Sequence, residues 1–127
     1  MRSAEIPQLL ELAEYAGQYT DRVMIVGRTV EYGGAVPTML ARRQVWGAQE
    51  GILSRSVVGE IAPVNRQLAS GAAALANVAY RSPFDLVCPA GACSETIDGV
   101  PMQFDYGHFT LPGATFVAAG LLDGWLP

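Results

Sequence analysis

Apolar and polar residues follow one another along this chain with the spacings of helices and short strands. In the first twenty residues the apolar positions recur every three or four residues, while Glu5, Glu11 and Glu14 fall outside the apolar stripe. This pattern predicts an amphipathic helix with Pro7 in its first turn and its end at Gly17. The stripe consists of Ile6, Leu9, Leu10, Leu12, Ala13 and Ala16.

Two short apolar runs predict strands that are covered on both faces, as in a parallel sheet. The runs are residues 23–27 and 77–80. Between them, helical spacing predicts a short helix over 36–43 and a longer helical segment over 48–76, which Pro63 and Gly71 are expected to interrupt. A strand, a helical excursion and a second strand together form a βαβ unit.

The C-terminal part of the chain has a different pattern, which predicts a hairpin. Asp98-Gly99 readily adopts the positive φ angles of a tight turn, and it lies between short arms at 94–97 and 100–104. Pro101 cannot donate a backbone hydrogen bond, so the second arm is expected to be an edge strand.

A final helix is predicted over 112–122, with Thr110 or Leu111 at its cap. The sequence contains no internal repeat and no linker-like segment. The order of the elements therefore predicts one layered α/β piece.

The composition excludes several classes of function. The chain has 127 residues, 50% of them hydrophobic, and a net charge of −4. It can therefore bury a core, and it carries no basic footprint for nucleic acid. No stretch approaches the ~20 apolar residues that span a bilayer, and the N-terminus lacks the apolar block of a signal peptide. Taken alone, these features predict a soluble protein made in the cytosol.

His108 is the only histidine in the chain, and Asp105 lies three residues before it. Imidazole takes up and returns a proton near neutral pH, and a neighbouring carboxylate can fix its tautomer and stabilise its charged form. The predicted elements place both residues at the end of a strand, where α/β folds gather active groups. The pair indicates part of a catalytic site; the alternative is a capping aspartate beside a histidine with structural hydrogen bonds.

Cys88 and Cys93 are separated by four residues that include Pro89 and Gly91, so the chain can fold back between them. Two thiols and one distant histidine do not complete a four-ligand metal site, and a redox motif would need Cys-x-x-Cys. We expect a local disulfide if the domain matures outside the cytosol, and two reduced thiols if it stays inside.

The segment from Cys88 to Leu121 resembles the final block of the SGNH (GDSL-type) hydrolases. It is most similar to the SGNH domain of bacterial membrane-bound acyltransferases (acyltransferase family 3, O-antigen acetylase type), which modify surface polysaccharides. There the block reads Asp-x-x-His, an apolar residue, Ser or Thr, two residues and Gly-Ala, after a cysteine pair and an Asp-Gly hairpin. The matching residues here are Asp105, His108, Phe109, Thr110, Gly113 and Ala114, preceded by Cys88, Cys93, Asp98 and Gly99.

The earlier part of the chain resembles the same family, in which a strand ends in a loop of the form Pro-x-Pro-Glu-Tyr. Here Arg28 and Thr29 replace the prolines before Glu31-Tyr32. The resemblance covers most of the chain as the C-terminal half of the family's domain. It implies that residues 1–127 form a single partial SGNH domain: a three-layer, flavodoxin-like α/β fold with a mainly parallel sheet, a C-terminal hairpin and a helix.

The resemblance implies a Ser-His-Asp type mechanism for an O-acyltransferase or esterase that acts on acyl groups of a cell-surface glycan. His108 would be the general base and Asp105 would orient it, with no cofactor and no metal. The family's serine lies in a Gly-Asp-Ser turn, and no serine of this chain has that context. The nucleophile blocks are therefore expected to be absent, and this chain alone to be nearly inactive. The alternative is a non-catalytic remnant that binds a glycan or packs against another domain.

The same resemblance implies a periplasmic or other extracytoplasmic location, with a membrane acyltransferase domain as a partner in the full-length protein. If this chain is the whole product, a cytoplasmic location is expected instead. The strand at 23–27 would expose an edge and apolar faces, so self-association is expected. Further candidates for a glycan cleft are Glu31, Tyr32, Trp46 and Trp125, although packing or a solvated loop is the commoner role of such residues.

Overall fold

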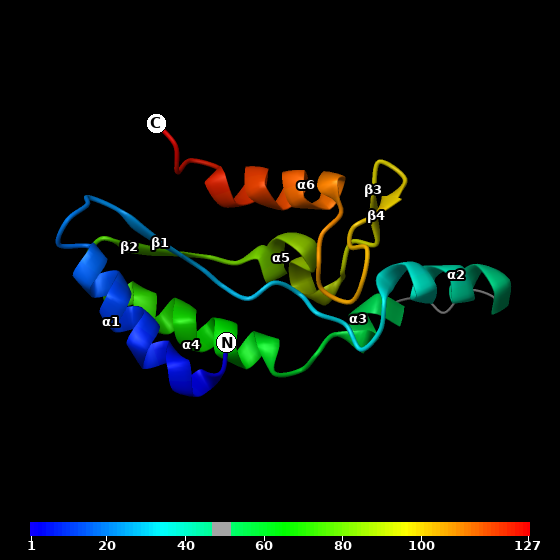
Figure 1. Cartoon of the computed structure of the whole chain (residues 1–127), viewed down its shortest axis with the longest axis horizontal. Coiled ribbons are helices and arrows are strands. Elements are labelled where there is room, and N and C mark those ends of the chain that lie inside the picture. Colours follow the sequence, from blue (N-terminus) through cyan, green and yellow to red (C-terminus); the bar gives the residue numbers. More distant parts are fainter. Residues whose placement is uncertain (47–51) are drawn as a thin grey trace. The chain divides into compact units, whose positions relative to one another are not determined.

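The chain folds as two compact units, each with one short sheet (Figure 1). The computed structural model describes residues 1–46 and 52–127. The first unit comprises Met1–Arg28 and Gly59–Ser82, and the second comprises Thr29–Val58 and Pro83–Pro127.

Two parallel strands form the centre of the first unit. β1 (Val23–Val26) pairs with β2 (Val78–Arg81) in register, from Val23 opposite Val78 to Val26 opposite Arg81. A single 3-10 turn, η1 (Ser3–Glu5), leads into α1 (Ile6–Ala16), and α4 (Ile61–Ala73) precedes β2. The two helices lie side by side along the strand pair (Figure 1). The predicted first helix and the parallel strand pair are thus confirmed.

The core of the first unit is made by apolar side chains of α1, α4 and β1. Its buried members are Ile6, Ala13, Ile25, Val64, Leu68 and Ala72. The prediction that Leu12 belongs to the apolar stripe was wrong: this side chain is 62% exposed, because it lies at the border of the face that α1 turns to the core. Val26 at the end of β1 is also exposed, so this strand is not covered on both faces along its whole length.

The second unit contains the hairpin and the other helices. These elements are α2 (Val36–Trp46), α3 (Ile52–Ser56), α5 (Pro83–Val87), the 3-10 turn η2 (Pro89–Gly91), β3 (Thr96–Ile97), β4 (Val100–Pro101) and α6 (Leu111–Leu122). Residues from both of its chain segments meet in one core, which consists of Val30, Tyr32, Val36, Met39, Leu53, Val87, Cys88, Met102 and Val117.

The helical segment predicted over 48–76 is divided differently from the expectation. Residues 48–51 lie outside the described residues. Beyond them, α3 and α4 are separated by residues 57–60, and neither Pro63 nor Gly71 interrupts a helix. Pro63 lies in the first turn of α4, where a missing backbone N–H costs no hydrogen bond.

The predicted fold class is confirmed as mixed α/β, with a short parallel sheet, a C-terminal antiparallel hairpin and a final helix. Asp98 and Gly99 form the hairpin turn with φ angles of 52° and 75°. The pattern did not predict α5 or η2, because each is a short helical turn that begins at a proline. Among the described residues, no helix has the length and apolar character needed to cross a membrane.

Candidate active site

The segment between β4 and α6 forms a small turn that carries Asp105 and His108. Gln103 and Phe109 form an isolated antiparallel bridge, and the backbone N–H of Phe104 donates to the carbonyl of His108 at 3.0 Å. These contacts close the turn, so that Asp105 and His108 face one another across it. The predicted hairpin and helix flank the pair, as expected from the sequence.

Asp105 accepts three hydrogen bonds within this turn. Its Oδ2 lies 2.7 Å from Nδ1 of His108, and its Oδ1 accepts from the backbone N–H groups of Gly107 and His108, both at 2.8 Å. Hydrogen bonds lower the pKa of Asp105 below its ordinary value. The largest effect comes from the backbone N–H of Gly107, followed by the backbone N–H and the ring of His108, while desolvation acts in the opposite direction. The carboxylate is therefore ionised at neutral pH and receives the Nδ1–H of His108.

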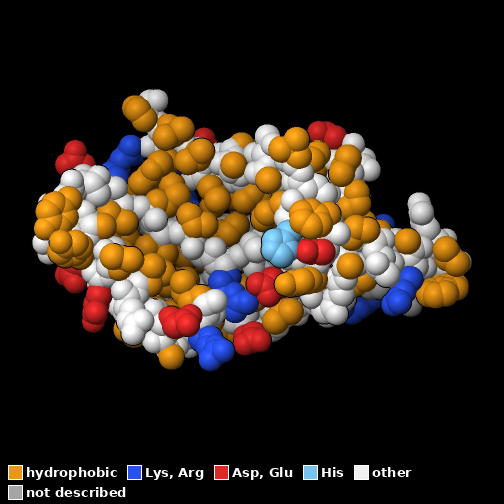
Figure 2. Space-filling view, viewed as in Figure 1, with side chains coloured by type: hydrophobic (Ala, Val, Ile, Leu, Met, Phe, Trp, Pro, Cys, Tyr) orange, Lys and Arg blue, Asp and Glu red, His pale blue; other side chains and the backbone are white. Residues whose placement is uncertain are grey.

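The imidazole of His108 is open to solvent. Its side chain is 65% exposed, against 31% for Asp105, and Figure 2 shows the ring at the surface beside a carboxylate. Nδ1 is engaged by Asp105, whereas Nε2 makes no hydrogen bond to the part of the chain that the structure describes. Nε2 can therefore accept a proton from a hydroxyl group that approaches from outside.

Buried contacts support the turn from within the second unit. The side-chain amide of Gln103 is fully buried and donates to the carbonyl of Val30 at 3.0 Å. The backbone N–H of Tyr32 donates to the carbonyl of Tyr106 at 2.8 Å. A segment far earlier in the sequence thus holds the backbone on both sides of Asp105.

Glu31 and Gly107 meet in the same region. A Cβ atom at Gly107 would lie 3.2 Å from Cγ of Glu31, so the absence of a side chain at Gly107 lets the Glu31 side chain lie against the turn. The backbone N–H of Val36, at the start of α2, donates to the carbonyl of Asp105 at 3.2 Å. The structure therefore places Glu31 next to the candidate pair.

Tyr32 was one of the candidates for sugar stacking, but the structure gives it the commoner role of core packing. Its ring is only 3% exposed and belongs to the core of the second unit. Burial, and to a smaller extent the charge of Glu95, raises the pKa of its hydroxyl to about 12. No face of this ring is available to a ligand.

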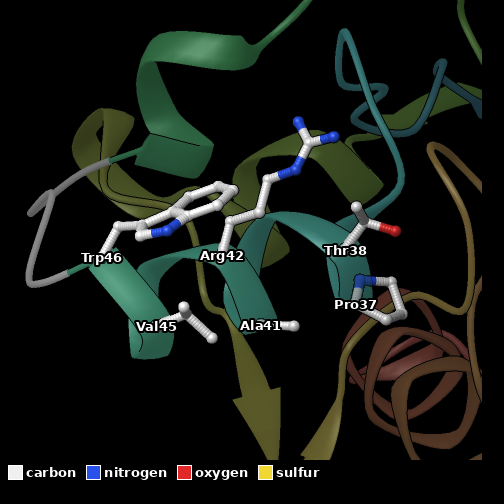
Figure 3. Close-up of a pocket in the computed structure, with 6 residues that line it drawn as sticks. All are labelled: Pro37, Thr38, Ala41, Arg42, Val45 and Trp46. Atoms are coloured by element: carbon white, nitrogen blue, oxygen red, sulfur yellow. The ribbon is translucent and has the colours of Figure 1, made fainter.

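Trp46 lies in another environment, at the end of α2. It is 76% exposed and lines a surface hollow of about 420 Å³ on one side of the helix (Figure 3). Asp105 and His108 do not line this hollow, whose walls are Pro37, Thr38, Ala41, Arg42, Val45 and Trp46. Trp125 is half-buried after the end of α6. Neither tryptophan has a ring contact with His108 among the described residues.

The start of α6 is fixed directly behind the pair. Oγ1 of Thr110, the N-cap residue, accepts from the backbone N–H of Gly113 at 3.3 Å and donates to the carbonyl of Pro101 at 2.8 Å. A Cβ atom at Gly113 would lie 2.2 Å from the carbonyl oxygen of Met102. The threonine and the glycine that follow His108 thus bring the helix close to the end of β4.

Cys88 and Cys93 form a disulfide bond. Cys88 lies in the core of the second unit, and the backbone N–H of Cys93 donates to Oγ of Ser54 on α3 at 3.1 Å. The bond therefore ties the chain just before the hairpin to the core. The described residues contain no cluster of three histidine, cysteine or acidic side chains that could bind a metal ion.

The sequence did not single out two aromatic residues that flank His108. The ring of Phe104 is stacked on the imidazole at a centroid distance of 5.8 Å and an interplanar angle of 19°. Tyr106 meets the imidazole edge-on at 5.9 Å and 71°. The available signal was the placement of two aromatic residues on either side of Asp105, at the end of the predicted hairpin.

Comparison with a solved structure supports the fold. The chain is similar to the structure of the Salmonella ser. Paratyphi A lipopolysaccharide acetyltransferase periplasmic domain, with a TM-score of 0.67 and 16% sequence identity. The similarity covers 82% of this chain and 41% of that chain, so this chain spans less than half of its structural relative. At this identity the likeness shows a shared fold. Among curated proteins there is no match.

Comparison with protein families identifies the chain more directly. The model of the SGNH domain fused to AT3 domains matches residues 2–123, which is nearly the whole chain. This match includes the cysteine pair, the hairpin, Asp105 and His108. The chain therefore belongs to the family of SGNH domains that are fused to AT3 domains.

Proposed function

We propose that this chain carries the general base of an O-acyltransferase or esterase that acts on acyl groups of a cell-surface glycan. The observation that supports this role is the pairing of His108 with Asp105 at 2.7 Å, in an imidazole side chain that is 65% exposed. An oriented imidazole of this kind is what a Ser-His-Asp type mechanism requires of its base.

In this proposal the nucleophile is a serine outside these 127 residues, since none of the serines present lies in a Gly-Asp-Ser turn. Nε2 of His108 takes the proton of that serine hydroxyl while the oxygen attacks the acyl carbonyl. Asp105 keeps the proton on Nδ1 and stabilises the imidazolium. The imidazolium then returns its proton to the leaving group, which is the sugar oxygen in an esterase and the acyl donor in a transferase. In the second step Nε2 takes the proton of a water molecule or of an acceptor hydroxyl, whose oxygen attacks the acyl-serine carbonyl. The acyl–serine bond breaks, and the imidazolium returns that proton to the serine oxygen.

The family and the disulfide support an extracytoplasmic setting for this reaction. SGNH domains of this family are fused to AT3 domains, so we propose a membrane acyltransferase domain as the partner that supplies acyl groups. The structural relative is a periplasmic domain. A disulfide such as Cys88–Cys93 persists in an oxidising compartment. We therefore propose the periplasm as the site of action.

The test uses the chain joined to an N-terminal segment that carries a Gly-Asp-Ser turn, taken from an SGNH domain of the same family. The rate at which the joined protein hydrolyses 4-methylumbelliferyl acetate is compared with the rate of the 127-residue chain alone. The rate of the 127-residue chain gives the background hydrolysis by an imidazole without a nucleophilic serine. We expect His108→Ala and Asp105→Asn each to lower kcat by about 10³-fold or more. Asp98→Asn is the matched control, because this exposed aspartate of the hairpin turn makes no contact with His108 and asparagine accepts its positive φ.

An unchanged rate in the His108→Ala protein would show that His108 is not the base. If the joined protein hydrolyses nothing but folds, the non-catalytic alternative, a glycan-binding or packing module, gains support. That alternative is favoured at present by one observation, the absence of a Gly-Asp-Ser turn in the sequence.

A further inference from the structure

Phe104 and Tyr106 are exposed aromatic residues beside His108. Their exposed fractions are 60% and 50%. Large aromatic side chains stabilise a fold when they are buried, and exposed ones do not contribute this free energy. Two such residues on one short turn therefore form a local apolar surface that the folding of this chain does not use.

The backbone fixes where these rings lie. Because the N–H of Phe104 donates to the carbonyl of His108, the two residues are neighbours across the turn, and their rings stack. Tyr106 is held by the bond from Tyr32 N–H to its carbonyl, and its ring meets the imidazole edge-on. The imidazole is thus flanked by one ring that is nearly parallel to it and one that is steeply inclined.

This arrangement has the chemistry of a sugar-binding surface. A pyranose ring has an apolar face of C–H groups and a rim of hydroxyl groups, and it binds to exposed aromatic rings through that apolar face. The centroids of both rings lie within 6 Å of the imidazole centroid, at 5.8 and 5.9 Å, so a hydroxyl group on the rim of a sugar that contacts them can reach the imidazole. A ligand that was apolar throughout would not need the neighbouring charged groups, Asp105 and His108.

We propose that Phe104 and Tyr106 bind a pyranose ring of the glycan substrate and present its oxygen to Nε2 of His108. This inference rests on the proposed function and adds to it the residues that recognise the sugar. The ring of Phe104, which is stacked on the imidazole and still 60% exposed, is the main contact. Tyr106 forms the second side.

The test measures sugar binding by the 127-residue chain and does not depend on catalysis. The single histidine gives one set of imidazole signals in NMR spectra, so these signals report on this surface without ambiguity. The probe is an acetylated xylo-oligosaccharide, used also after alkaline deacetylation. Both forms are expected to shift the imidazole signals with affinities in the millimolar range, because the pyranose face is common to both.

Variants separate this surface from other exposed aromatic residues. Phe104→Ala is expected to weaken binding by about fivefold, which corresponds to one lost aromatic contact of about 1 kcal/mol. Phe104→Tyr retains an aromatic face and should bind like the parent chain. Trp46→Ala is the control, since Trp46 is also exposed, at 76%, but lines a surface hollow to which Phe104 and Tyr106 do not contribute. The same NMR spectra check folding. In a folded variant the imidazole proton is expected on Nδ1, because Asp105 accepts that N–H.

The proposal is overturned if neither form of the oligosaccharide shifts the imidazole signals, or if Phe104→Ala binds as tightly as the parent chain. It is also overturned if Trp46→Ala weakens binding as much as Phe104→Ala. An inactive joined protein whose chain still binds the sugar through Phe104 would contradict the proposed function alone. An active protein with unaltered binding in Phe104→Ala would contradict the sugar-binding surface alone.

Discussion

The carboxylate of Asp105 holds both the backbone of the turn and the imidazole of His108. Its two oxygens accept from two backbone N–H groups and from the imidazole of His108, at 2.7–2.8 Å. The backbone bonds hold the turn, and the third bond decides which nitrogen of His108 is protonated. One residue thus sets both the conformation of the loop and the chemistry of the ring.

The lowered pKa of Asp105 predicts a pH dependence of stability. Because the pKa is lower in the folded chain than the ordinary value of 3.8, the ionised carboxylate stabilises the fold above that value. This contribution is lost as the pH falls from about 4 through the lowered pKa. Urea unfolding between pH 7 and pH 3 should therefore show an acid-dependent loss that is smaller in Asp105→Asn. Equal losses in the two proteins would show that these hydrogen bonds do not persist in solution.

At the scale of single elements, α6 depends on its first turn. Thr110 caps this helix and also bonds to the carbonyl of Pro101, so one hydroxyl joins the helix to the hairpin. We expect Thr110→Ala to lower the free energy of unfolding by about 1–2 kcal/mol, because both bonds are lost. Thr110→Ser keeps the hydroxyl and should cost much less. Chemical denaturation measures both, and equal losses would contradict a capping role.

The disulfide before the hairpin gives a second prediction for an element. Cys88–Cys93 closes a short loop, and the chain-entropy model predicts that reducing it costs about 2 kcal/mol of stability. The unfolding midpoint in urea should therefore fall when dithiothreitol is added. A double variant, Cys88→Ala with Cys93→Ala, is the control and should not respond to the reductant. A midpoint of the parent chain that does not move would contradict the prediction.

For the whole molecule, the short parallel sheet is the feature with the clearest consequence. Among the described residues β1 pairs only with β2, so each strand has an unpaired edge, and Val26 is 45% exposed. Unpaired edges with apolar side chains favour association with another chain. We predict that the 127-residue chain self-associates as its concentration rises, measured by sedimentation velocity. Val26→Lys places a charge at the edge and should weaken association, whereas a monomer at all concentrations would refute the prediction.

Local patterns predicted the elements that contain their own signals. Pro7 and Gly17 bound the first helix, Asp98-Gly99 forms the hairpin turn, and Thr110 caps the last helix, because each residue acts on its nearest neighbours in the chain. Residues 57–60 were predicted to be helical, but they separate α3 from α4. The prediction failed because apolar residues keep a helical spacing across this break.

Local patterns in the sequence were sufficient to predict the first and last helices, the two parallel strands, the hairpin, and the pairing of Asp105 with His108 three residues later. These depend on turns and caps, whose energies are local. The burial of Tyr32, the exposure of Leu12 and the position of Phe104 and Tyr106 beside the imidazole became visible only in the folded chain. The reason is that burial depends on distant partners: the bond that supports the turn joins Gln103 to Val30, 73 residues away, and no local pattern contains that contact.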